Sequence, residues 1–364
     1  RNQDPWNRTY RLTFDSTGGS SVKSQDILPG GYVSAPEPPV REGYSFSGWY
    51  TKPEATRYDY WYFDYDPVYS NMTLYAKWDE SSVPYVDANG SSMPPEEAEG
   101  IFDDSLEGLF TLSESGASGG WYAAQKDFGG DRTGLVIDGD VNLILCDGVT
   151  LKLYDGIKVP QGSSLTIWAQ STDAMTRGSI EVFKNYSDAA IGTSLTEPGG
   201  SVIINGGTVR ATGNAGAASI GGLDTNITIN GGSFDIAMEN RESGYTNNLA
   251  YCGAAIGTGN AATGGWSSPY KTMRITINGG DFVGFTQVDS PIIGVANGSG
   301  NLNAVIDING GSFDLLTEDK VDNTMTGGAC IGTGVQGYYG ALVPDITITG
   351  ATTWSLTGLL KEED

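Results

Sequence analysis

One short stretch recurs through the C-terminal half of the chain and limits what the chain can fold into. Its three clearest copies are ITINGGSF at 227–234, ITINGGDF at 275–282 and IDINGGSF at 306–313. VIINGGTV at 202–209 precedes them, and the degenerate copy ITITGATT at 346–353 closes the series. Apolar residues two apart, followed by a glycine pair and another apolar residue, predict a short strand, a sharp corner and a second strand.

A second motif recurs between these copies, but the connecting lengths vary. It occurs as AAIGT (189–193), ASIGG (218–222), AAIGT (254–258), PIIGV (291–295) and ACIGT (329–333). Constant motifs joined by connections of unequal length are typical of a parallel β-helix, in which strands stack and corners tolerate insertions. We therefore predict a right-handed parallel β-helix.

Aligning the copies on the asparagine predicts which side chains stack above one another. We expect a hydrogen-bonded column at the corner, made by Asn205, Asn230, Asn278 and Asn309. The position two residues earlier should face outward, and it holds Ile203, Thr228, Thr276, Asp307 and Thr347. Beyond the corner, we expect Arg210 and Asp235 to form an ion pair between layers.

Composition extends the prediction to the whole chain. With 53 glycines and a net charge of −24 in 364 residues, the sequence is too rich in glycine for a helical protein and too long for one small domain. We expect an all-β protein with two or more domains. The acidity argues against nucleic acid and anionic membrane surfaces as partners, because both are bound through clustered Lys and Arg.

Two absences from the sequence bear on location. It has no run of about 18 apolar residues that could span a bilayer. It also shows no signal peptide at its start. We expect no membrane insertion in this segment, and we interpret it as a mature or trimmed extracellular piece.

Histidine and cysteine usage limits the chemistry. There is no histidine, which removes the commonest general base and metal ligand. The three cysteines, Cys146, Cys252 and Cys330, lie within or beside apolar stretches, and their odd number does not suit a disulfide framework. We predict buried free thiols, with one bridge plus a reactive thiol as the alternative.

Residues 10–79 form a separate pattern, after a leader at 1–9. Alternating apolar residues predict strands at Tyr10–Phe14, around Tyr44–Trp49 and at Leu74–Trp78. TFDSTGG, PVREGYSFSGWYT and TLYAKW occur in this order. These motifs closely resemble the Listeria–Bacteroides repeat, the internalin-type B-repeat family. The resemblance implies a small β-grasp-like module of secreted or surface-anchored bacterial proteins, serving as a spacer or adhesion unit.

The aromatic residues of this module have two possible roles. We expect Trp49, Tyr50, Tyr75 and Trp78 to form its core rather than a ligand platform, because so small a module needs its large side chains for its own interior. The stretch YDYWYFDYDPVY at 58–69 carries three acids, Asp59, Asp64 and Asp66. Their spacing lacks the glycine of an EF-hand loop, which favours a solvated loop over a calcium site.

The remainder divides into an acidic, proline-containing linker at 80–105, a β-helix at 106–358 and a tail at 359–364. Asp-Gly turns separate apolar strands over 134–171, so the β-helix begins before its repeats become visible. This region, followed by the AIGT and INGG copies, resembles a family of glycine-rich β-helix domains of gut bacteria. Some relatives in that family are described as carbohydrate-binding, and the resemblance implies the same for this chain.

Three connections at one edge of the β-helix are the candidate binding site. Residues 259–274 carry Trp266 and Tyr270, and residues 334–345 carry Tyr338 and Tyr339. The connection between them, 296–305, carries Asn297, Asn301 and Asn303. We expect the aromatic loops to leave the same edge two layers apart, flanking a polar groove about 10 Å wide, near the length of a disaccharide. The alternative is that both loops bury their rings against the helix.

These features predict a non-catalytic bacterial cell-surface or secreted protein for adhesion and glycan binding. Asp235 and Asp314 lie on separate coils and do not make the paired acid and base of a glycosidase. The first alternative is a polysaccharide lyase or glycoside hydrolase on the β-helix. The second alternative is a structural surface spacer. We expect no cofactor. The acidic loops 238–251 and 317–328 leave a calcium site open, without a ligand pattern that defines it.

Overall fold

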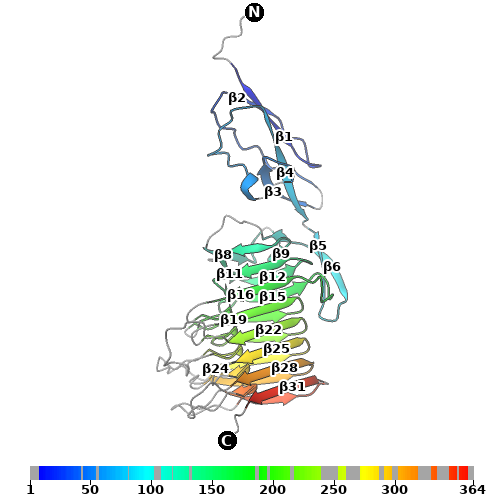
Figure 1. The fold of residues 1–364 in the computed structure, drawn as a ribbon, viewed down its shortest axis with the longest axis vertical. Coiled ribbons are helices and arrows are strands. Elements are labelled where there is room, and N and C mark those ends of the chain that lie inside the picture. The colour runs from blue at the N-terminus through cyan, green and yellow to red at the C-terminus, as the bar shows by residue number, and fades with distance from the viewer. Residues whose placement is uncertain are drawn as a thin grey trace, which may run out of the picture. The chain divides into compact units, whose positions relative to one another are not determined.

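The computed structural model divides the chain into two compact units, Arg1–Val83 and Pro84–Asp364, drawn in Figure 1. Apart from one 3₁₀ turn, the regular secondary structure of the described residues in both units is β-strand. The structure describes residues 8–41, 44–54, 57–80, 82–101, 108–116, 118–130, 133–184, 188–194, 197–213, 217–238, 253–259, 271–286, 291–296, 302–318, 329–333, 344–350 and 352–359.

The first unit is a four-stranded mixed sheet in the order β2-β1-β4-β3. Its strands are β1 (Tyr10–Asp15), β2 (Gln25–Ile27), β3 (Tyr44–Tyr50) and β4 (Met72–Glu80), and a 3₁₀ turn, η2, covers Arg57–Asp59. The first and last strands run parallel in the middle, and β2 and β3 flank them antiparallel. This arrangement agrees with the β-grasp-like module that the family resemblance implies.

Unlike side chains fill the interior of this unit. Leu12, Phe14, Trp49 and Leu74 are buried together, with Phe14 and Trp49 in edge-to-face contact at 4.8 Å. Trp78 packs against this cluster and donates its indole N–H to the carbonyl of Ser16 at 2.8 Å. Trp49 and Trp78 thus belong to the core as predicted, whereas Tyr50 and Tyr75 are only half-buried.

The second unit stacks its strands into three parallel sheets. The NGG sheet contains β9 (Trp121–Ala124), β12 (Asp140–Leu145), β15 (Ser164–Ala169), β18 (Ser201–Ile204), β21 (Asn226–Ile229), β24 (Lys271–Ile277), β27 (Leu302–Ile308) and β30 (Asp345–Ile348). The aromatic sheet contains β10 (Phe128–Gly130), β13 (Thr150–Leu153), β16 (Ser179–Phe183), β19 (Thr208–Gly213), β22 (Ser233–Met238), β25 (Asp281–Thr286), β28 (Gly311–Glu318) and β31 (Thr352–Leu359). The IG sheet contains β8 (Gly108–Ser113), β11 (Thr133–Asp138), β14 (Ile157–Lys158), β17 (Ile191–Gly192), β20 (Ile220–Gly221), β23 (Ile256–Gly257), β26 (Ile293–Val295) and β29 (Ile331–Thr333).

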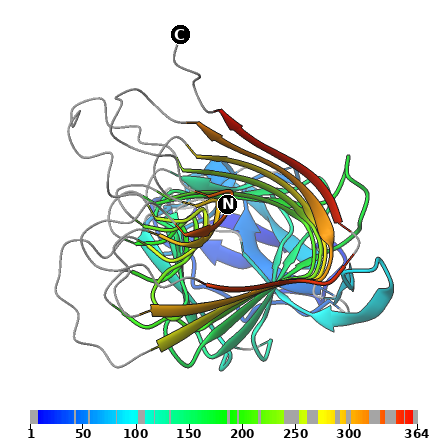
Figure 2. The ribbon, with the colours of Figure 1, turned by 90° about the horizontal axis from the view of Figure 1, so that it is seen from below.

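Each coil contributes one strand to each sheet in a fixed order. The chain passes from the NGG sheet to the aromatic sheet, then to the IG sheet, and back to the NGG sheet one layer further on. Seen along the stack in Figure 2, strands of successive coils lie over one another around a common interior. The second unit is therefore a parallel β-helix.

The register confirms the predicted asparagine column. Asn230 donates its side-chain amide to Asn205 at 2.7 Å, Asn278 to Asn230 at 2.7 Å, and Asn309 to Asn278 at 2.8 Å. The Thr349 hydroxyl donates to Asn309 at 2.7 Å and ends the ladder. Exposure rises along the column, from buried Asn205 through half-buried Asn230 to exposed Asn278 and Asn309.

An aromatic column runs inside the β-helix. The rings stack with centroids 4.5–4.7 Å apart and nearly parallel planes, in the order Phe234, Phe282, Phe313 and Trp354. The three phenylalanines are almost fully buried. Each follows an NGG corner, so the repeated motif supplies both the corner ladder and the interior stack.

The glycine of the IG motif recurs in five successive layers. Gly192, Gly221, Gly257, Gly294 and Gly332 all have φ between +135° and +143°. A Cβ placed on Gly257 would overlap the carbonyl oxygen of Gly294 in the next layer, and the same overlap recurs from Gly192 to Gly294. Glycine is therefore required both for the backbone angle and for the close approach of the layers.

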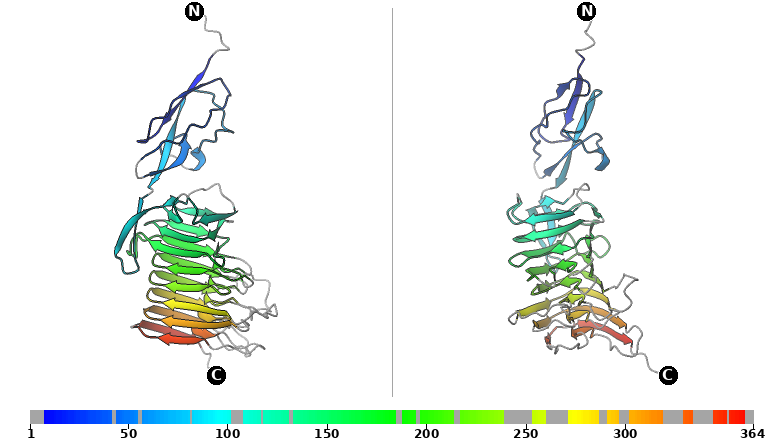
Figure 3. Two further views of the ribbon diagram at one scale, coloured as in Figure 1. Left: turned by 180° about the vertical axis from the view of Figure 1, so that it is seen from behind. Right: turned by 90° about the vertical axis from the view of Figure 1, so that its left-hand side faces the viewer.

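The segment expected to be a linker differs from that expectation. Half of it forms strands: β5 (Ser82–Val86), which spans the boundary between the units, and β6 (Ser92–Glu97) and β7 (Glu99–Gly100) of the second unit. Tyr85, 5% exposed, packs against Trp121 at 5.1 Å and Trp168 at 5.0 Å, which fixes β5 to the first coils. The prolines of SMPPEE lie in β6, which pairs with β5 at the sheet margin, where proline is tolerated. Figure 3 shows this hairpin beside the stacked coils.

Two of the three cysteines lie within the described residues. Cys146 is buried, as predicted, and Cys330 is half-buried. Cys252 lies outside the described residues.

Candidate functional site

Most of the predicted glycan-binding residues lie outside the part of the chain that the structure describes. These are Trp266, Tyr270, Tyr338, Tyr339, Asn297 and Asn301. Asn303 lies in β27, where it pairs with Thr272 of β24. The grouping of these side chains around a groove remains a prediction.

The strands that flank these connections are described, and they fix where each connection starts and ends. The three connections run from β23 to β24, from β26 to β27 and from β29 to β30, in each case from the IG sheet to the NGG sheet. The flanking strands are neighbours in both sheets. The connections therefore leave and re-enter one edge of the β-helix in three successive layers, about 4.8 Å apart.

The same edge carries a polar hollow in the preceding layers, with a volume of about 500 Å³.

Four successive IG-to-NGG connections line this polar hollow. Its polar side chains are Asp140, Gln161, Ser163, Ser164, Ser201, Asp224 and Asn226. Four of them begin consecutive strands of the NGG sheet and pair in register, in the order Asp140, Ser164, Ser201 and Asn226. The hollow is thus a column of polar strand starts, one from each layer.

Short turns and glycines shape the hollow. A Cβ on Gly200 would overlap the carbonyl oxygen of Ser163, so the backbone of two layers meets there without side chains between them. Asp224 adopts a left-handed backbone with φ of 54° at the turn before β21. The Ser164 hydroxyl donates to Asp140 at 2.6 Å, and the Asn226 N–H donates to the Gly200 carbonyl at 3.0 Å. The result is a glycine-backbone floor with carboxylate, amide and hydroxyl groups around it.

These groups suit a ligand rich in hydroxyls. Carboxylates accept hydrogen bonds, while side-chain amides and hydroxyls both donate and accept. Within the described residues, no group of three or more Cys, Asp or Glu side chains is placed to hold a metal ion. The acidic loops 238–251 and 317–328, named above for calcium, lie almost wholly outside those residues.

Sequence reasoning missed the hollow, although a signal was present. Four residues before two of the corner asparagines stands a small polar side chain, Ser201 before Asn205 and Asn226 before Asn230. The predicted site instead relied on aromatic loops, which start from later layers of the same edge. The short turns that complete the hollow carry no repeated motif of their own.

The aromatic sheet carries the predicted ion pair within a longer charge ladder. Arg210 contacts Glu181 at 2.9 Å and Asp235 at 3.7 Å, and Lys152 contacts Glu181 at 3.1 Å. The hydrogen bond to Glu181 raises the pKa of Lys152. The Arg210–Asp235 prediction is confirmed, with Glu181 as the nearer partner. These carboxylates lie opposite cations across layers.

Two of the three acids considered for calcium in the first unit have other partners. Asp59 accepts from the Lys52 ammonium at 2.6 Å, and Asp66 accepts from the Tyr62 N–H at 2.7 Å. Asp64 lines a separate groove. The stretch 58–69 thus contributes a folded turn to this unit.

Comparison with known proteins identifies the first unit. Residues 10–77 match the model of the Listeria-Bacteroides repeat domain, which confirms the sequence-based assignment. Over 92 residues the chain is 38% identical to an Evansella cellulosilytica protein provisionally named a Gly-rich membrane protein, covering 25% of this chain and 10% of that protein. A second protein of that organism, provisionally named a membrane protein, is 36% identical over 92 residues, covering 25% of this chain and 14% of the relative. The similarity therefore spans a small part of each relative.

Within the described residues, no helix is long and apolar enough to cross a membrane.

Proposed function

We propose that this chain is a non-catalytic attachment segment of a bacterial cell-surface protein, and that its β-helix binds glycans along the IG-to-NGG edge. The Listeria-Bacteroides repeat and the names of the relatives support a surface-associated protein. The observation that carries the glycan proposal is the polar hollow, to which four successive layers contribute.

The spacing of the layers supports an extended saccharide as the ligand. Two layers span about 10 Å, near the length of a disaccharide. Hydroxyl, amide and carboxylate groups repeated at this spacing can meet successive sugar units with similar hydrogen bonds. The connections carrying Trp266, Tyr270, Tyr338 and Tyr339 start from later layers of the same edge, where their rings would extend the site by stacking on sugar faces.

The described carboxylates support binding rather than hydrolysis. Asp140 accepts from the Ser164 hydroxyl, and Glu181 and Asp235 face Arg210. A glycosidase needs a general acid and a base or nucleophile facing one glycosidic bond. The ladder carboxylates instead lie opposite cations on the aromatic sheet, away from the polar hollow.

A glycan array with the full chain tests this proposal. We expect binding to a defined set of saccharides, weakened about tenfold or more by Asp140→Ala combined with Asn226→Ala. Trp266→Ala combined with Tyr338→Ala tests the loop contribution separately. Arg210→Ala, on the aromatic sheet, is the matched control and should leave the array pattern unchanged. Unaltered binding by both double variants would contradict the proposed edge, and an absence of binding by the unmodified chain would favour a spacer.

A further inference from the structure

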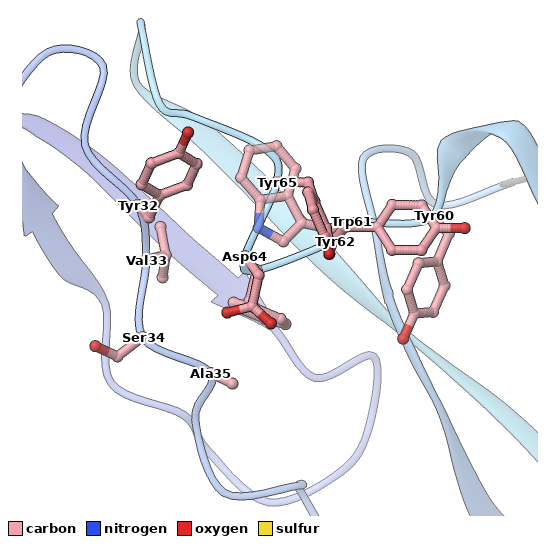
Figure 4. A pocket seen from close by; sticks show the side chains of 10 residues that line it. Tyr32, Val33, Ser34, Ala35, Tyr60, Trp61, Tyr62, Asp64 and Tyr65 are labelled. Carbon is pink, nitrogen blue, oxygen red and sulfur yellow. The ribbon is translucent and has the colours of Figure 1, made fainter.

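The first unit carries a groove that its core does not explain. The tyrosine groove, shown in Figure 4, has a volume of about 580 Å³ and is lined by Tyr32, Val33, Trp61, Tyr62, Asp64 and Tyr65 among others. It lies entirely within Arg1–Val83. Nothing in the family resemblance assigned it a role.

Backbone hydrogen bonds hold both walls in place. Gly31 and Val68 form a bridge with N–H···O distances of 2.8 Å from Gly30 to Val68 and 3.0 Å from Val68 to Gly31. Opposite, Tyr65 and Asp66 donate to the Tyr62 carbonyl at 3.0 and 2.8 Å, closing a turn. The groove is therefore largely formed before any ligand arrives, which lowers the entropy cost of binding.

Exposed rings stand above an apolar floor. Tyr32 is 57% exposed, Tyr62 46% and Tyr65 79%, whereas Val33 and Trp61 are buried. A small unit gains no core stability from tyrosines left this exposed. Tyrosine is enriched at binding surfaces because its ring is apolar and its hydroxyl stays hydrated.

The indole N–H of Trp61 is an independent indication of a ligand. Trp61 is only 6% exposed, and its nitrogen has no hydrogen-bond acceptor within the described residues. By contrast, Trp78 donates to Ser16 at 2.8 Å and Trp168 to Asn142 at 3.0 Å. A buried donor without an acceptor is uncommon and destabilising. In Figure 4, the nitrogen-bearing edge of Trp61 faces the part of the groove lined by Val33 and Asp64.

We propose that the tyrosine groove is a second carbohydrate-binding site, which takes a neutral or amino sugar. A sugar hydroxyl both accepts and donates, so it complements the Trp61 N–H and the Asp64 carboxylate together. Tyr32, Tyr62 and Tyr65 supply ring faces for the apolar side of the sugar. The carboxylate of Asp64 and the net charge of −24 disfavour acidic sugars.

A proline-rich peptide is the competing occupant, because such peptides also dock in aromatic-lined grooves. Its carbonyl would accept from Trp61 but would leave the Asp64 carboxylate without a donor. The site lies in a different unit from the polar hollow, so the two proposals can be tested independently. Two sites on one chain would strengthen attachment to a repeating glycan through avidity.

The test records the indole N–H resonances of the full chain, which has eight tryptophans. Trp61→Phe identifies the Trp61 signal. Maltohexaose and chitohexaose are the neutral probes, oligogalacturonate is the acidic probe and decaproline is the peptide probe, together with saccharides selected from a glycan array. We expect a neutral or amino saccharide to shift the Trp61 signal, and oligogalacturonate and decaproline to leave it in place.

Variants of the exposed rings then assign the site. Tyr32→Ala and Tyr65→Ala should each weaken saccharide binding about tenfold, and Asp64→Asn should weaken it without altering the fold. Tyr58→Ala, an exposed tyrosine outside the groove, is the matched control and should have no effect. The proposal is overturned if decaproline alone shifts the Trp61 signal, or if no saccharide does so and the groove variants bind like the unmodified chain.

Discussion

The two units build an all-β interior in different ways. In the first, unlike side chains such as Leu12, Phe14 and Trp49 meet once, in a single cluster. In the second, like side chains meet repeatedly in columns, as Phe234, Phe282 and Phe313 do. In the cluster each contact occurs once, whereas in a column the same contact between like side chains recurs in each layer. A substitution should therefore act on the whole of the first unit but be felt most strongly by neighbouring layers of the second.

The largest effect is expected where a column permits one residue type. Gly257→Ala combines an unfavourable φ of +143° with overlap against the Gly294 carbonyl. We expect a loss of about 4 kcal/mol or more in the second unit. Urea unfolding should show the loss in the transition of the second unit alone. Gly30→Ala in the first unit, where a Cβ meets only ordinary contacts, should cost about 1 kcal/mol. Equal costs would contradict the proposed difference.

Removing one ring from the aromatic column should come next. Phe282→Ala leaves a cavity between Phe234 and Phe313, and we expect a loss of about 3–5 kcal/mol. Trp49→Ala should cost a similar amount but unfold the first unit outright, because a small unit has less stability to lose. Calorimetry of the full chain distinguishes a unit that unfolds at a lower temperature from a unit that shows no unfolding transition. Survival of the first unit in Trp49→Ala would break the comparison.

The asparagine ladder should show a graded effect. Asn230→Ala removes the donor to Asn205 and the acceptor of Asn278 at a half-buried position. We expect this variant to lose about 1–2 kcal/mol of its free energy of unfolding. Asn309→Ala, at an exposed position, should cost less because water replaces the lost partners. Chemical denaturation of both variants provides the measurement. A larger loss at Asn309 would show that burial does not set the strength of the ladder.

The smallest effect concerns the start of the second unit, where unlike aromatics meet as they do in the first. Burial, followed by the negative charge of Glu96, raises the pKa of Tyr85. The folded state thus favours the protonated phenol. The stability that this phenol contributes is fully present below pH 10 and is lost as the pH rises through the pKa of Tyr85 in the folded state. Tyr85→Phe should lose less stability than the unmodified chain above pH 10. Thermal melts at pH 8 and above pH 10 test this, and parallel curves would contradict it.

The sequence predicted the asparagine column because repetition of the motif reveals it, whereas the aromatic column was not predicted. Asn230, Asn278 and Asn309 follow the same motif, so their alignment needs no knowledge of the loops. The β5–β6 hairpin was missed because the packing of Tyr85 between Trp121 and Trp168 joins residues that share no motif. The unpaired N–H of Trp61 was also unpredictable, since it depends on which carbonyls the folded chain brings near.

The distance between two outward positions of one column tests the stacking of layers most directly. Lys152 and Asp314 lie five layers apart through Glu181, Arg210, Asp235 and Val283. Spin labels at Lys152→Cys and Asp314→Cys, with the three natural cysteines replaced by alanine, report that distance by pulsed electron resonance. Stacked coils predict a narrow distribution centred near 24 Å, from about 4.8 Å per layer. A broad distribution, or one centred at twice that distance, would contradict the parallel β-helix and the binding edge built on it.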